Sequence, residues 1–301
     1  MPAGLLAANP TLKSYNRPMF TRRSFSAAAL GAASATLLPA AKINSTFKGV
    51  TIGLQSYSFR DRDLDGAIAA MSEIGIGSVE LFSGHVEPRL RDRAEMRKWR
   101  ETVPLSHFEA VRKKLDEAGI EIWAYNYSFR DDFSDKEVER GFEFAKALGV
   151  NRLTASSNVS TAKRIDPFAA KAKVYVGMHN HSNIKPNEFA TPDDFAEAMK
   201  GTSKYIGINL DIGHFWAANF DPIAYLEKTA NRQVCIHLKD RKKNQGPNMP
   251  FGEGDTPIKA VLELMAKKKY KFPANIEYEY KGADSKVEVK KCFDYCKGLL
   301  A

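Results

Sequence analysis

The sequence predicts a (β/α)8 barrel that occupies residues 48–301 as a single domain. Three observations support this fold class. Candidate strands and helices alternate along the whole region, which is the pattern of parallel βα units. The region is close to the roughly 250 residues that such barrels need. In addition, four candidate strands alternate apolar and polar residues, so each has one apolar and one polar face.

The strands are expected at residues 50–57, 77–82, 120–127, 151–156, 174–180, 206–212, 233–239 and 274–280. The last four alternate most clearly, in the segments 176–181, 208–212, 235–239 and 275–279. One face of each carries Ile, Leu, Met or Tyr, and the other carries His, Asp, Glu or Lys. We therefore expect the apolar faces to contact the helices and the polar faces to line the centre of the barrel.

The helices are expected at residues 64–74, 104–118, 135–148, 164–173, 191–200, 221–230, 256–268 and 284–299, with the fourth one short. Gly75, Gly119 and Gly149 follow the first three, where a left-handed residue often ends a helix. Two later helices begin at Asp221-Pro222 and Thr256-Pro257, and proline is favoured in the first turn. We find no internal repeat and no second domain.

Residues 1–41 are predicted to be an export signal. Arg22-Arg23 precedes an apolar run of small residues from Ala27 to Leu38, which is the pattern of a signal peptide. The paired arginines indicate the twin-arginine route. The apolar run is too short and too rich in alanine to span a membrane stably. We therefore expect the twin-arginine export machinery as a partner, a periplasmic location, and no stable membrane span in the mature protein.

The charge of the chain does not indicate nucleic-acid binding. The whole chain has 45 Lys and Arg against 36 Asp and Glu, a net charge of +9. Residues 1–41 contain four basic residues and no acidic one, so the remainder has 41 against 36, a net charge of +5. This excess is small, and we expect no nucleic-acid partner. Only three cysteines occur, Cys235, Cys292 and Cys296, which does not fit a disulfide framework.

Four inward positions near the ends of successive strands predict a metal site. They are His179, Asp211, His237 and Glu277. A single inward histidine is more often part of a core, but four potential ligands at matching positions make that reading weak. Imidazole and carboxylate ligands together suit Mn, Zn, Co or Fe better than Ca. We expect one divalent ion, of undetermined identity.

Other polar residues at this end of the barrel are candidates for catalysis. His181, Lys239 and Glu279 share the inward face of the ligands, one step nearer the mouth, and Glu80 points inward from the second strand. His214 follows the sixth strand. For proton transfer we consider Glu80, His181, Lys239 and His214, against purely structural ion pairs. Glu279 is expected to contact the substrate.

Two further substrate contacts and one basic segment are predicted less directly. His85 lies in the long loop after the second strand, with solvent exposure as the alternative. Tyr125, with Trp123 and Tyr127, is expected on the inner face of the third strand, where it could stack on a sugar or simply fill the barrel. The basic residues of segment 89–100 are read as a solvated helix face or, alternatively, as contacts to an acidic group of a substrate.

The chain resembles the sugar phosphate isomerase/epimerase family of xylose isomerase-like TIM barrels over residues 50–298. The motifs that carry this resemblance are Val79-Glu80-Leu81, Met178-His179-Asn180-His181, Asp211-Ile212-Gly213-His214, His237-Leu238-Lys239-Asp240, Gly252-Glu253-Gly254 and Ile276-Glu277. The resemblance implies one divalent metal bound by His179, Asp211, His237 and Glu277. Many members have Glu in place of His179, and in ketose 3-epimerases that Glu shares proton transfer with the Glu of the last strand. The His-Asn-His form is similar to branches near inosose dehydratase and enzymes of 3-keto-glycosides.

These observations predict a divalent-metal-dependent carbohydrate isomerase, epimerase or lyase acting next to a sugar carbonyl. A metal bound to the carbonyl and a neighbouring oxygen stabilises the enediolate formed when the adjacent proton leaves. The substrate would be a keto-sugar, a cyclitol or a keto-glycoside, and an oligomer is compatible with the sequence.

Two alternatives remain open. The first is a non-catalytic exported barrel that binds sugar and no metal. The second is a nuclease similar to the apurinic endonucleases, which resemble the chain at Asp211-x-x-His214 and Gly252-Glu253-Gly254. Those enzymes hold three zinc ions and need more histidines than the six present here.

Overall fold

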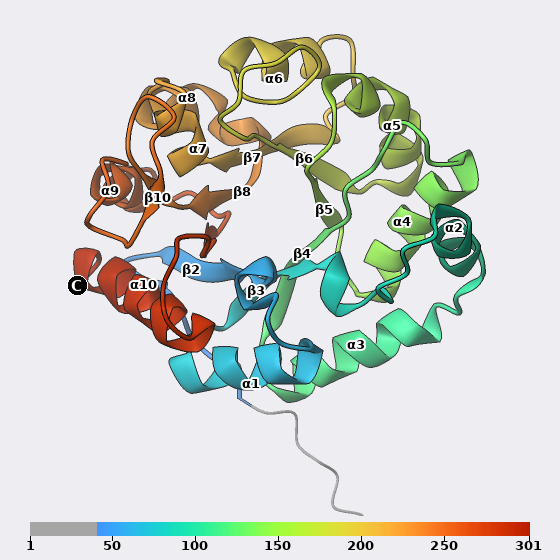
Figure 1. Cartoon of the computed structure of the whole chain (residues 1–301), viewed down its shortest axis with the longest axis horizontal. Helices are drawn as coiled ribbons and strands as arrows, with labels where there is room; N and C mark the ends of the chain where they lie inside the picture. Colours follow the sequence, from blue (N-terminus) through green and yellow to red (C-terminus); the bar gives the residue numbers. More distant parts are fainter. Residues whose placement is uncertain (1–40) are drawn as a thin grey trace, which may run out of the picture. The chain divides into compact units, whose positions relative to one another are not determined.

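The computed structural model describes residues 41–301, and in this part of the chain eight parallel strands close into a barrel (Figure 1). The strands are β2 (Val50–Gln55), β3 (Ser78–Phe82), β4 (Glu121–Asn126), β5 (Arg152–Ala155), β6 (Tyr175–His179), β7 (Ile206–Asp211), β8 (Gln233–Leu238) and β11 (Ala274–Ile276). Each pairs with the next, and pairing of β2 with both β3 and β11 closes the ring. The predicted (β/α)8 barrel is therefore confirmed.

Eight helices surround the barrel near the predicted positions (Figure 1). They are α1 (Leu64–Ile74), α3 (Ser106–Glu117), α4 (Asp135–Ala147), α5 (Val159–Ala172), α6 (Pro192–Met199), α8 (Pro222–Thr229), α9 (Ile258–Lys268) and α10 (Ser285–Leu299). The predicted glycines end or follow their helices with positive φ, for example 91° at Gly75. The expectation of a short fourth helix is wrong, because α5 begins at Val159. Its first turn is held by Asp131, which accepts bonds from the hydroxyls of Ser160 and Thr161.

Several short elements escaped the sequence prediction. The helices are α2 (Arg93–Thr102) and α7 (Ile212–Ala217), with 3-10 turns η1 (Ser56–Phe59), η2 (Ser83–His85) and η3 (Ala230–Arg232). The strands are β1 (Thr46–Phe47), β9 (Asp240–Arg241) and β10 (Asn248–Met249). Most of them lie in loops that follow strands, so they shape the end of the barrel where a site is expected.

The hydrophobic core lies between the strands and the helices, as the alternation predicts. Ile208, Leu210, Ile236, Leu238 and Ile276 are all fully buried on the outer face of the strands. The inner face of the same strands carries the polar side chains. This division leaves a polar centre enclosed by an apolar layer.

A bulge in β4 corrects one expectation about the inner face. Val79 of β3 pairs with Ile122 but Glu80 pairs with Ala124, so one residue of β4 is skipped. The alternation therefore reverses after Trp123, and Tyr125 points out of the barrel, where its ring lies 6.2 Å from that of Phe108 in α3. Tyr125 is fully buried there and is not a substrate contact.

Part of the basic segment 89–100 has a role that neither reading expected, whereas Arg89, Arg91 and Lys98 are exposed. Three arginines of α2, namely Arg93, Arg97 and Arg100, bind carboxylates of neighbouring elements. Arg93 donates two hydrogen bonds to Glu137 of α4, at 2.8 and 2.7 Å, and Arg100 donates two to Glu87. The Glu137 side chain is completely buried. This part of the segment fastens α2 to the barrel, so it is neither a free solvated face nor a substrate contact.

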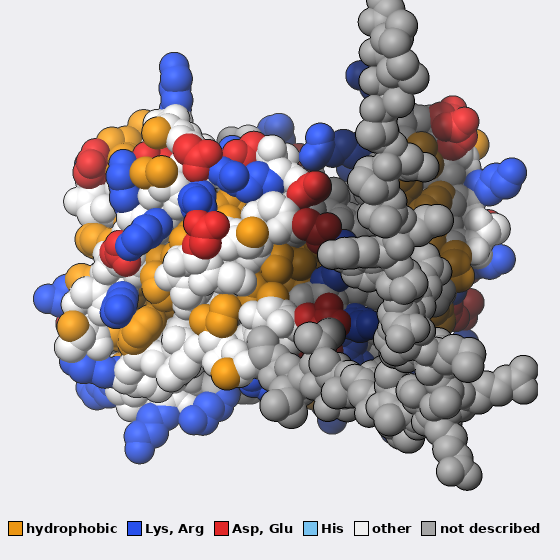
Figure 2. Space-filling view, turned by 90° about the horizontal axis from the view of Figure 1, so that it is seen from below, with side chains coloured by type: hydrophobic (Ala, Val, Ile, Leu, Met, Phe, Trp, Pro, Cys, Tyr) orange, Lys and Arg blue, Asp and Glu red, His pale blue; other side chains and the backbone are white. Residues whose placement is uncertain are grey.

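The predictions about the signal segment, the cysteines and the surface charge concern different parts of the chain. Residues 1–40, which carry all but the last residue of the predicted signal, lie outside the described part. Within residues 41–301 no helix is both long and apolar enough to cross a membrane. All three cysteines are buried and free. On the visible described surface of Figure 2, basic and acidic side chains are interspersed, without the broad basic field that nucleic-acid binding uses.

Candidate metal centre

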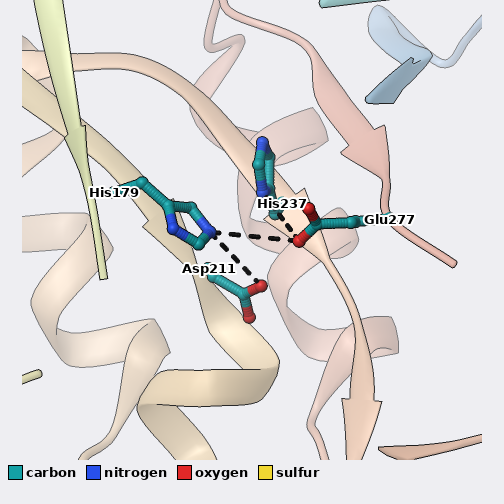
Figure 3. Close-up of side chains that lie close together, drawn as sticks. All are labelled: His179, Asp211, His237 and Glu277. Atoms are coloured by element: carbon teal, nitrogen blue, oxygen red, sulfur yellow. Dashed lines mark hydrogen bonds and ion pairs between the residues drawn. The ribbon is translucent and has the colours of Figure 1, made fainter. Parts of the chain in front are cut away.

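The four predicted ligands meet at the C-terminal end of the barrel (Figure 3). His179 ends β6, Asp211 ends β7, His237 lies near the end of β8, and Glu277 follows β11. One potential ligand atom from each lies within 4.8 Å of all the others. His179 Nε2 is 3.7 Å from Asp211 Oδ2 and 3.9 Å from Glu277 Oε2. All four side chains are buried.

Strand register explains why these four residues share one level. Asp211 of β7 is paired with His237 of β8, and His237 is paired with Asn275 of β11, two residues before Glu277. Because neighbouring parallel strands end at the same edge, inward residues at their ends converge. Because side chains alternate between the two faces of a strand, these residues all point to the inner face of the barrel.

The cluster has properties of a cation site. His179 Nε2 and Asp211 Oδ2 are buried and accept no well-directed hydrogen bond from the described residues, although Lys239 Nζ forms an ion pair with Oδ2 at 3.2 Å. Burial raises the pKa of Asp211 and of Glu277, but Lys239 and the neighbouring imidazoles hold both pKa values well below their usual range. Unpaired lone pairs and ionised carboxylates are what a divalent ion requires, and the donor set of two imidazoles and two carboxylates suits Zn or Mn. The residues present therefore fit such an ion.

The second nitrogen of each histidine is held by a neighbour, which orients the first one. Ser156 Oγ lies 3.2 Å from His179 Nδ1, and Glu80 Oε2 lies 2.7 Å from His237 Nε2. His179 therefore presents Nε2 and His237 presents Nδ1 to the centre. Burial lowers the pKa of His237, but the carboxylates of Glu80 and Glu277 raise it well above its usual value. Partners of this kind fix the ring and tune its basicity at metal sites.

Glu80 lies one layer below the cluster and does not line the cavity. Its carboxylate is fully buried and accepts hydrogen bonds from Gln55 Nε2 and Thr154 Oγ1, both at 2.6 Å, and from Asn275 Nδ2 at 3.0 Å. The expected catalytic role of Glu80 is thus not favoured. The sequence could not show this depth, because Glu80 is the third of five residues in β3 and not its last.

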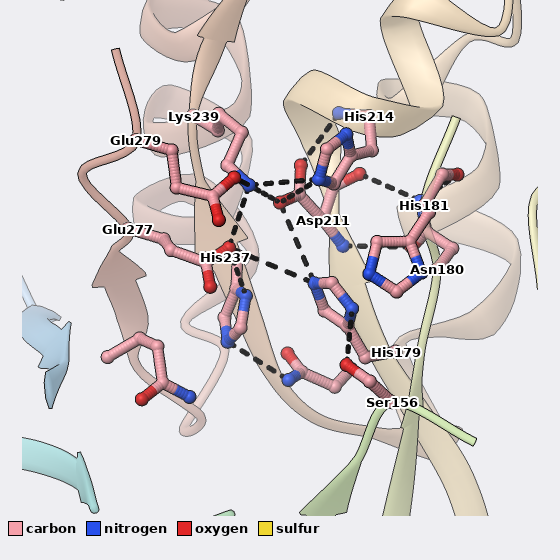
Figure 4. A network of polar contacts seen from close by, with 12 residues as sticks. Ser156, His179, Asn180, His181, Asp211, His214, His237, Lys239, Glu277 and Glu279 are labelled. Atoms are coloured by element: carbon pink, nitrogen blue, oxygen red, sulfur yellow. Dashed lines mark hydrogen bonds and ion pairs between the residues drawn. The ribbon is translucent and has the colours of Figure 1, made fainter. Parts of the chain in front are cut away.

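A polar cavity of about 260 Å³ opens above the cluster (Figure 4). It is lined by Gln55, Tyr57, Phe82, Asn126, Ser128, Ser156, His179, His181, His214, His237, Lys239, Glu277 and Glu279. Three predicted ligands line it directly, and Asp211 lies just behind them. The structure therefore brings the candidate ligands together with His181, His214, Lys239 and Glu279.

Lys239 is the centre of an ion-pair network in this cavity (Figure 4). Its Nζ lies 2.6 Å from Glu279 Oε2, 2.9 Å from Glu277 Oε2 and 3.2 Å from Asp211 Oδ2. Burial lowers the pKa of Lys239, but these carboxylates raise it above its usual value. His214 Nε2 lies 2.9 Å from the same Nζ. Lys239 is therefore a permanent cation that balances part of the negative charge of the site.

The two histidines near the mouth differ in their surroundings. His214 is buried in α7, one turn after Asp211, whose Oδ1 accepts the backbone N–H of His214. Burial lowers the pKa of His214 well below its usual value, so the ring is neutral. His181 is exposed, and its ring centre is 5.0 Å from that of His179. Of the candidate proton carriers, His181 is the one with access to solvent.

His85 and Tyr125 do not belong to the site. His85 lies behind the wall, where its Nδ1 is 3.0 Å from Ser56 Oγ and its Nε2 is 3.1 Å from the carbonyl oxygen of Phe59. With both ring nitrogens occupied inside the protein, His85 does not line the cavity. Tyr125 points outward because of the bulge in β4.

The structure adds residues that the sequence did not indicate. Tyr57 and Phe82 form an aromatic wall, with ring centres 5.1 Å apart, and Asn126, Ser128 and Ser156 form a neighbouring polar wall. All five lie in turns or at strand ends, where no periodic pattern exists. Only their position at the ends of predicted strands, or directly after one in the case of Ser128, could have drawn attention to them.

Asp240 and Arg241 hold the loop after β8 in place, and Arg241 does so by donating to the carbonyl oxygen of Gly246. The carboxylate of Asp240 accepts the backbone N–H groups of Gly252, Gly254 and Thr256. A side chain at Gly254 would collide with that carboxylate. The glycines of the Gly252-Glu253-Gly254 motif therefore serve loop geometry, and the Glu between them is exposed.

A parallel barrel with an inward polar cluster at the C-terminal ends of its strands belongs to the class of barrels whose active sites lie at that end. Comparison with known families identifies the branch: the chain belongs to the xylose isomerase-like TIM barrel family, whose model matches residues 68–297. The predicted resemblance to this family is thus confirmed.

Individual relatives are distant. The chain is 24% identical to the L-ribulose-5-phosphate 3-epimerase UlaE of Escherichia coli over 197 residues, which is 65% of this chain and 67% of that protein. Among solved structures, the probable 3-DHS dehydratase AsbF from Bacillus anthracis has a TM-score of 0.62 at 16% identity, covering 81% of this chain and 98% of that one. The IOLI protein with a bound zinc atom has a TM-score of 0.60 at 13% identity, covering 83% and 99%.

Proposed function

We propose that the protein is a divalent-metal-dependent enzyme that removes a proton next to the carbonyl group of a small carbohydrate. The observation that carries this proposal is the buried cluster of His179, Asp211, His237 and Glu277 at the floor of a polar cavity. The relatives support the substrate class, since one is named as a sugar epimerase, and the zinc in another supports the metal.

The chemistry divides between the ion and the side chains of this chain. A bound divalent cation would supply Lewis-acid polarisation of a carbonyl oxygen, which acidifies the neighbouring C–H group. Glu277 lies on one side of the cavity floor, and its ionised carboxylate can hold a substrate hydroxyl or accept a proton. His181 faces the cavity from the mouth, where a neutral imidazole can exchange protons with solvent.

The arrangement favours β-elimination over epimerisation by two carboxylates. Epimerisation of that kind needs one carboxylate on each face of the reacting carbon. In this cavity Glu277 and Glu279 both follow β11, whereas the β6 side carries the imidazoles of His179 and His181. A carboxylate facing an imidazole suits removal of a proton by one group and assistance to a departing oxygen by the other. The dehydratase named among the structural neighbours is consistent with this reaction class.

We further propose that the protein acts outside the cytoplasm, after twin-arginine export. This rests on Arg22-Arg23 and the apolar run that follows them. Export in a folded state would allow the metal to be bound before the protein crosses the membrane.

The first test is metal content together with proton exchange. Elemental analysis of the purified protein should find about one divalent ion per chain, lost in His179→Ala and His237→Ala. The matched control is His107→Ala, because His107 is bonded to the carbonyl oxygen of Val86 outside the cavity. In D2O, 3-keto-glycosides and inososes should exchange or eliminate at the carbon next to the carbonyl. A protein that binds no ion after reloading with Mn or Zn would instead be a non-catalytic sugar-binding barrel.

A further inference from the structure

Among the described residues, the cavity lining contains no lysine or arginine that is free to bind an anion. Among the described residues that line it, Lys239 is the only lysine or arginine. Its ammonium group has three N–H donors, and three carboxylates lie within 3.2 Å of it, those of Glu279, Glu277 and Asp211. The Lys239 side chain is also only 2% exposed. A phosphate could reach it only by displacing a carboxylate, and it would then face the others.

Two arginines, Arg60 and Arg241, lie behind residues of the cavity wall and are held there by other protein groups. Arg60 donates from Nη1 to the carbonyl oxygens of Tyr57 and Tyr278. Arg241 donates to the carbonyl oxygen of Gly246 and to Ser182 Oγ, and its Nη1 lies 2.7 Å from Nδ1 of the lining residue His214. Neither arginine is itself part of the lining. Arginine is the usual residue for paired contacts to phosphate. This role is therefore not filled in the described structure.

The part of the usual phosphate position that follows the eighth strand is acidic here. In many (β/α)8 enzymes phosphate binds at the loops after the seventh and eighth strands, next to a helix N-terminus. The eighth strand is β11, and the loop after it carries Glu277 and Glu279. The helix that follows, α10, is capped by Asp284, whose carboxylate accepts the N–H of Lys286. An anion at this position would be repelled.

The other walls suit an uncharged sugar. The rings of Tyr57 and Phe82 offer an apolar surface, and the guanidinium of Arg60 lies 4.7 Å from the ring centre of Tyr57. Ser128 and Asn126 present short polar groups beside this surface. Aromatic rings pack against the C–H face of a sugar while polar groups bind its hydroxyls. The volume of about 260 Å³ lies below the roughly 300–1,000 Å³ of sites for drug-sized ligands, which fits a single sugar ring.

We propose that this cavity binds an uncharged keto-sugar or cyclitol ring against Tyr57 and Phe82, and that it rejects sugar phosphates. The inference rests on the proposed function, and it distinguishes this chain from its relative named for a phosphorylated pentulose. Selectivity arises because Lys239, the only lysine or arginine among the described lining residues, is already surrounded by carboxylates.

The test uses pairs of ligands that differ only in the phosphate. Binding of L-ribulose and L-ribulose 5-phosphate, and of D-fructose and D-fructose 6-phosphate, is measured by calorimetry on the full chain loaded with zinc. We expect the free sugar of at least one pair to bind at least about tenfold more tightly, because a phosphate in this cavity would contact carboxylates of like charge. Tyr57→Leu should weaken binding of the free sugar by about tenfold, whereas Tyr57→Phe, which keeps the ring, should not.

A charge variant tests the cause of the selectivity. Glu279→Gln removes one carboxylate from the surroundings of Lys239. It should reduce the difference in affinity between the free sugar and the sugar phosphate. The same substitution at the exposed Glu253 is the control and should leave the difference unchanged. Equal or tighter binding of the phosphates, or binding of no free sugar, would overturn the inference. Selective binding of the free sugar without any proton exchange would support the inferred selectivity and contradict the proposed reaction. Proton exchange on both the free sugar and its phosphate would support the proposed reaction and contradict the inferred selectivity.

Discussion

Replacement of Asp211 by asparagine separates the metal-binding role of this residue from its structural role. Asp211 Oδ1 caps α7 by accepting the N–H of His214, and Oδ2 points into the cluster without a hydrogen-bond partner among the described residues. Asparagine keeps an oxygen for the cap and loses the charge and the second oxygen. The variant should therefore fold and should bind a divalent ion much more weakly.

The expected size follows from linkage. An ion present at about 100 times its Kd stabilises the folded state by about 2.7 kcal/mol. For a domain of this size each kcal/mol shifts Tm by roughly 2–4 °C, so zinc should raise Tm by about 5–10 °C. In Asp211→Asn this shift should vanish, while the metal-free protein should lose no more than about 3 kcal/mol, because Glu277 and Glu279 still face Lys239.

The assay is thermal unfolding with and without zinc after treatment with a chelator. The matched control is Asp221→Asn, because Asp221 caps α8 in the same way, through Ile223 and Ala224, at an exposed site. It should retain the full zinc shift. If Asp211→Asn kept the same shift as the unmodified protein, the ion would bind elsewhere and the assigned ligand set would be wrong.

Three further outcomes are expected. Glu80→Gln should lower zinc affinity about 10–100-fold without changing the stoichiometry, because it weakens the hold on His237, and calorimetry measures both quantities. Arg241→Lys should speed amide hydrogen exchange in the loop after β6, which Arg241 fixes with a forked side chain that lysine lacks; unchanged exchange would contradict this role. The pKa values of Asp211 and Glu277 are lowered on folding, so their contribution to stability is present above their unfolded values of 3.8 and 4.5. This contribution should be lost as the pH falls below about 4. Denaturant unfolding at pH 3–7 measures the free energy of unfolding of the metal-free protein and of Asp211→Asn. That free energy should fall more steeply with decreasing pH in the unmodified protein than in Asp211→Asn.

The ligand set was predictable because it depends only on local alternation and on parallel order. Each of His179, Asp211 and His237 lies at or beside the end of a strand with period two, and Glu277 continues the alternation of β11. Adjacent parallel strands bring such ends together without any knowledge of packing. The same reasoning failed at Tyr125, because one skipped residue in β4 reverses every later side chain of that strand.

Depth within the barrel and the shape of the loops could not be predicted in this way. Glu80 has the correct face, but its height relative to His237 depends on the stagger of β3 against the other strands. Tyr57 and Phe82 become neighbours because the turn after β2 and the end of β3 lie side by side, although they are 25 residues apart in the chain. Contacts of this kind depend on tertiary structure, and the sequence shows only which loops can take part.

The charge balance of the site links its stability to its proposed function. Four carboxylates, those of Glu80, Asp211, Glu277 and Glu279, surround the centre, and Lys239 is the only permanent cation among the described residues that contact them. Burial makes these charges costly, but Lys239 and the neighbouring imidazoles keep Asp211 and Glu277 ionised, so the metal-free site retains an excess of negative charge. One divalent cation would reduce this excess. On the proposal made above, the carboxylates that make the cluster fit a metal also surround Lys239 and so disfavour a phosphorylated substrate.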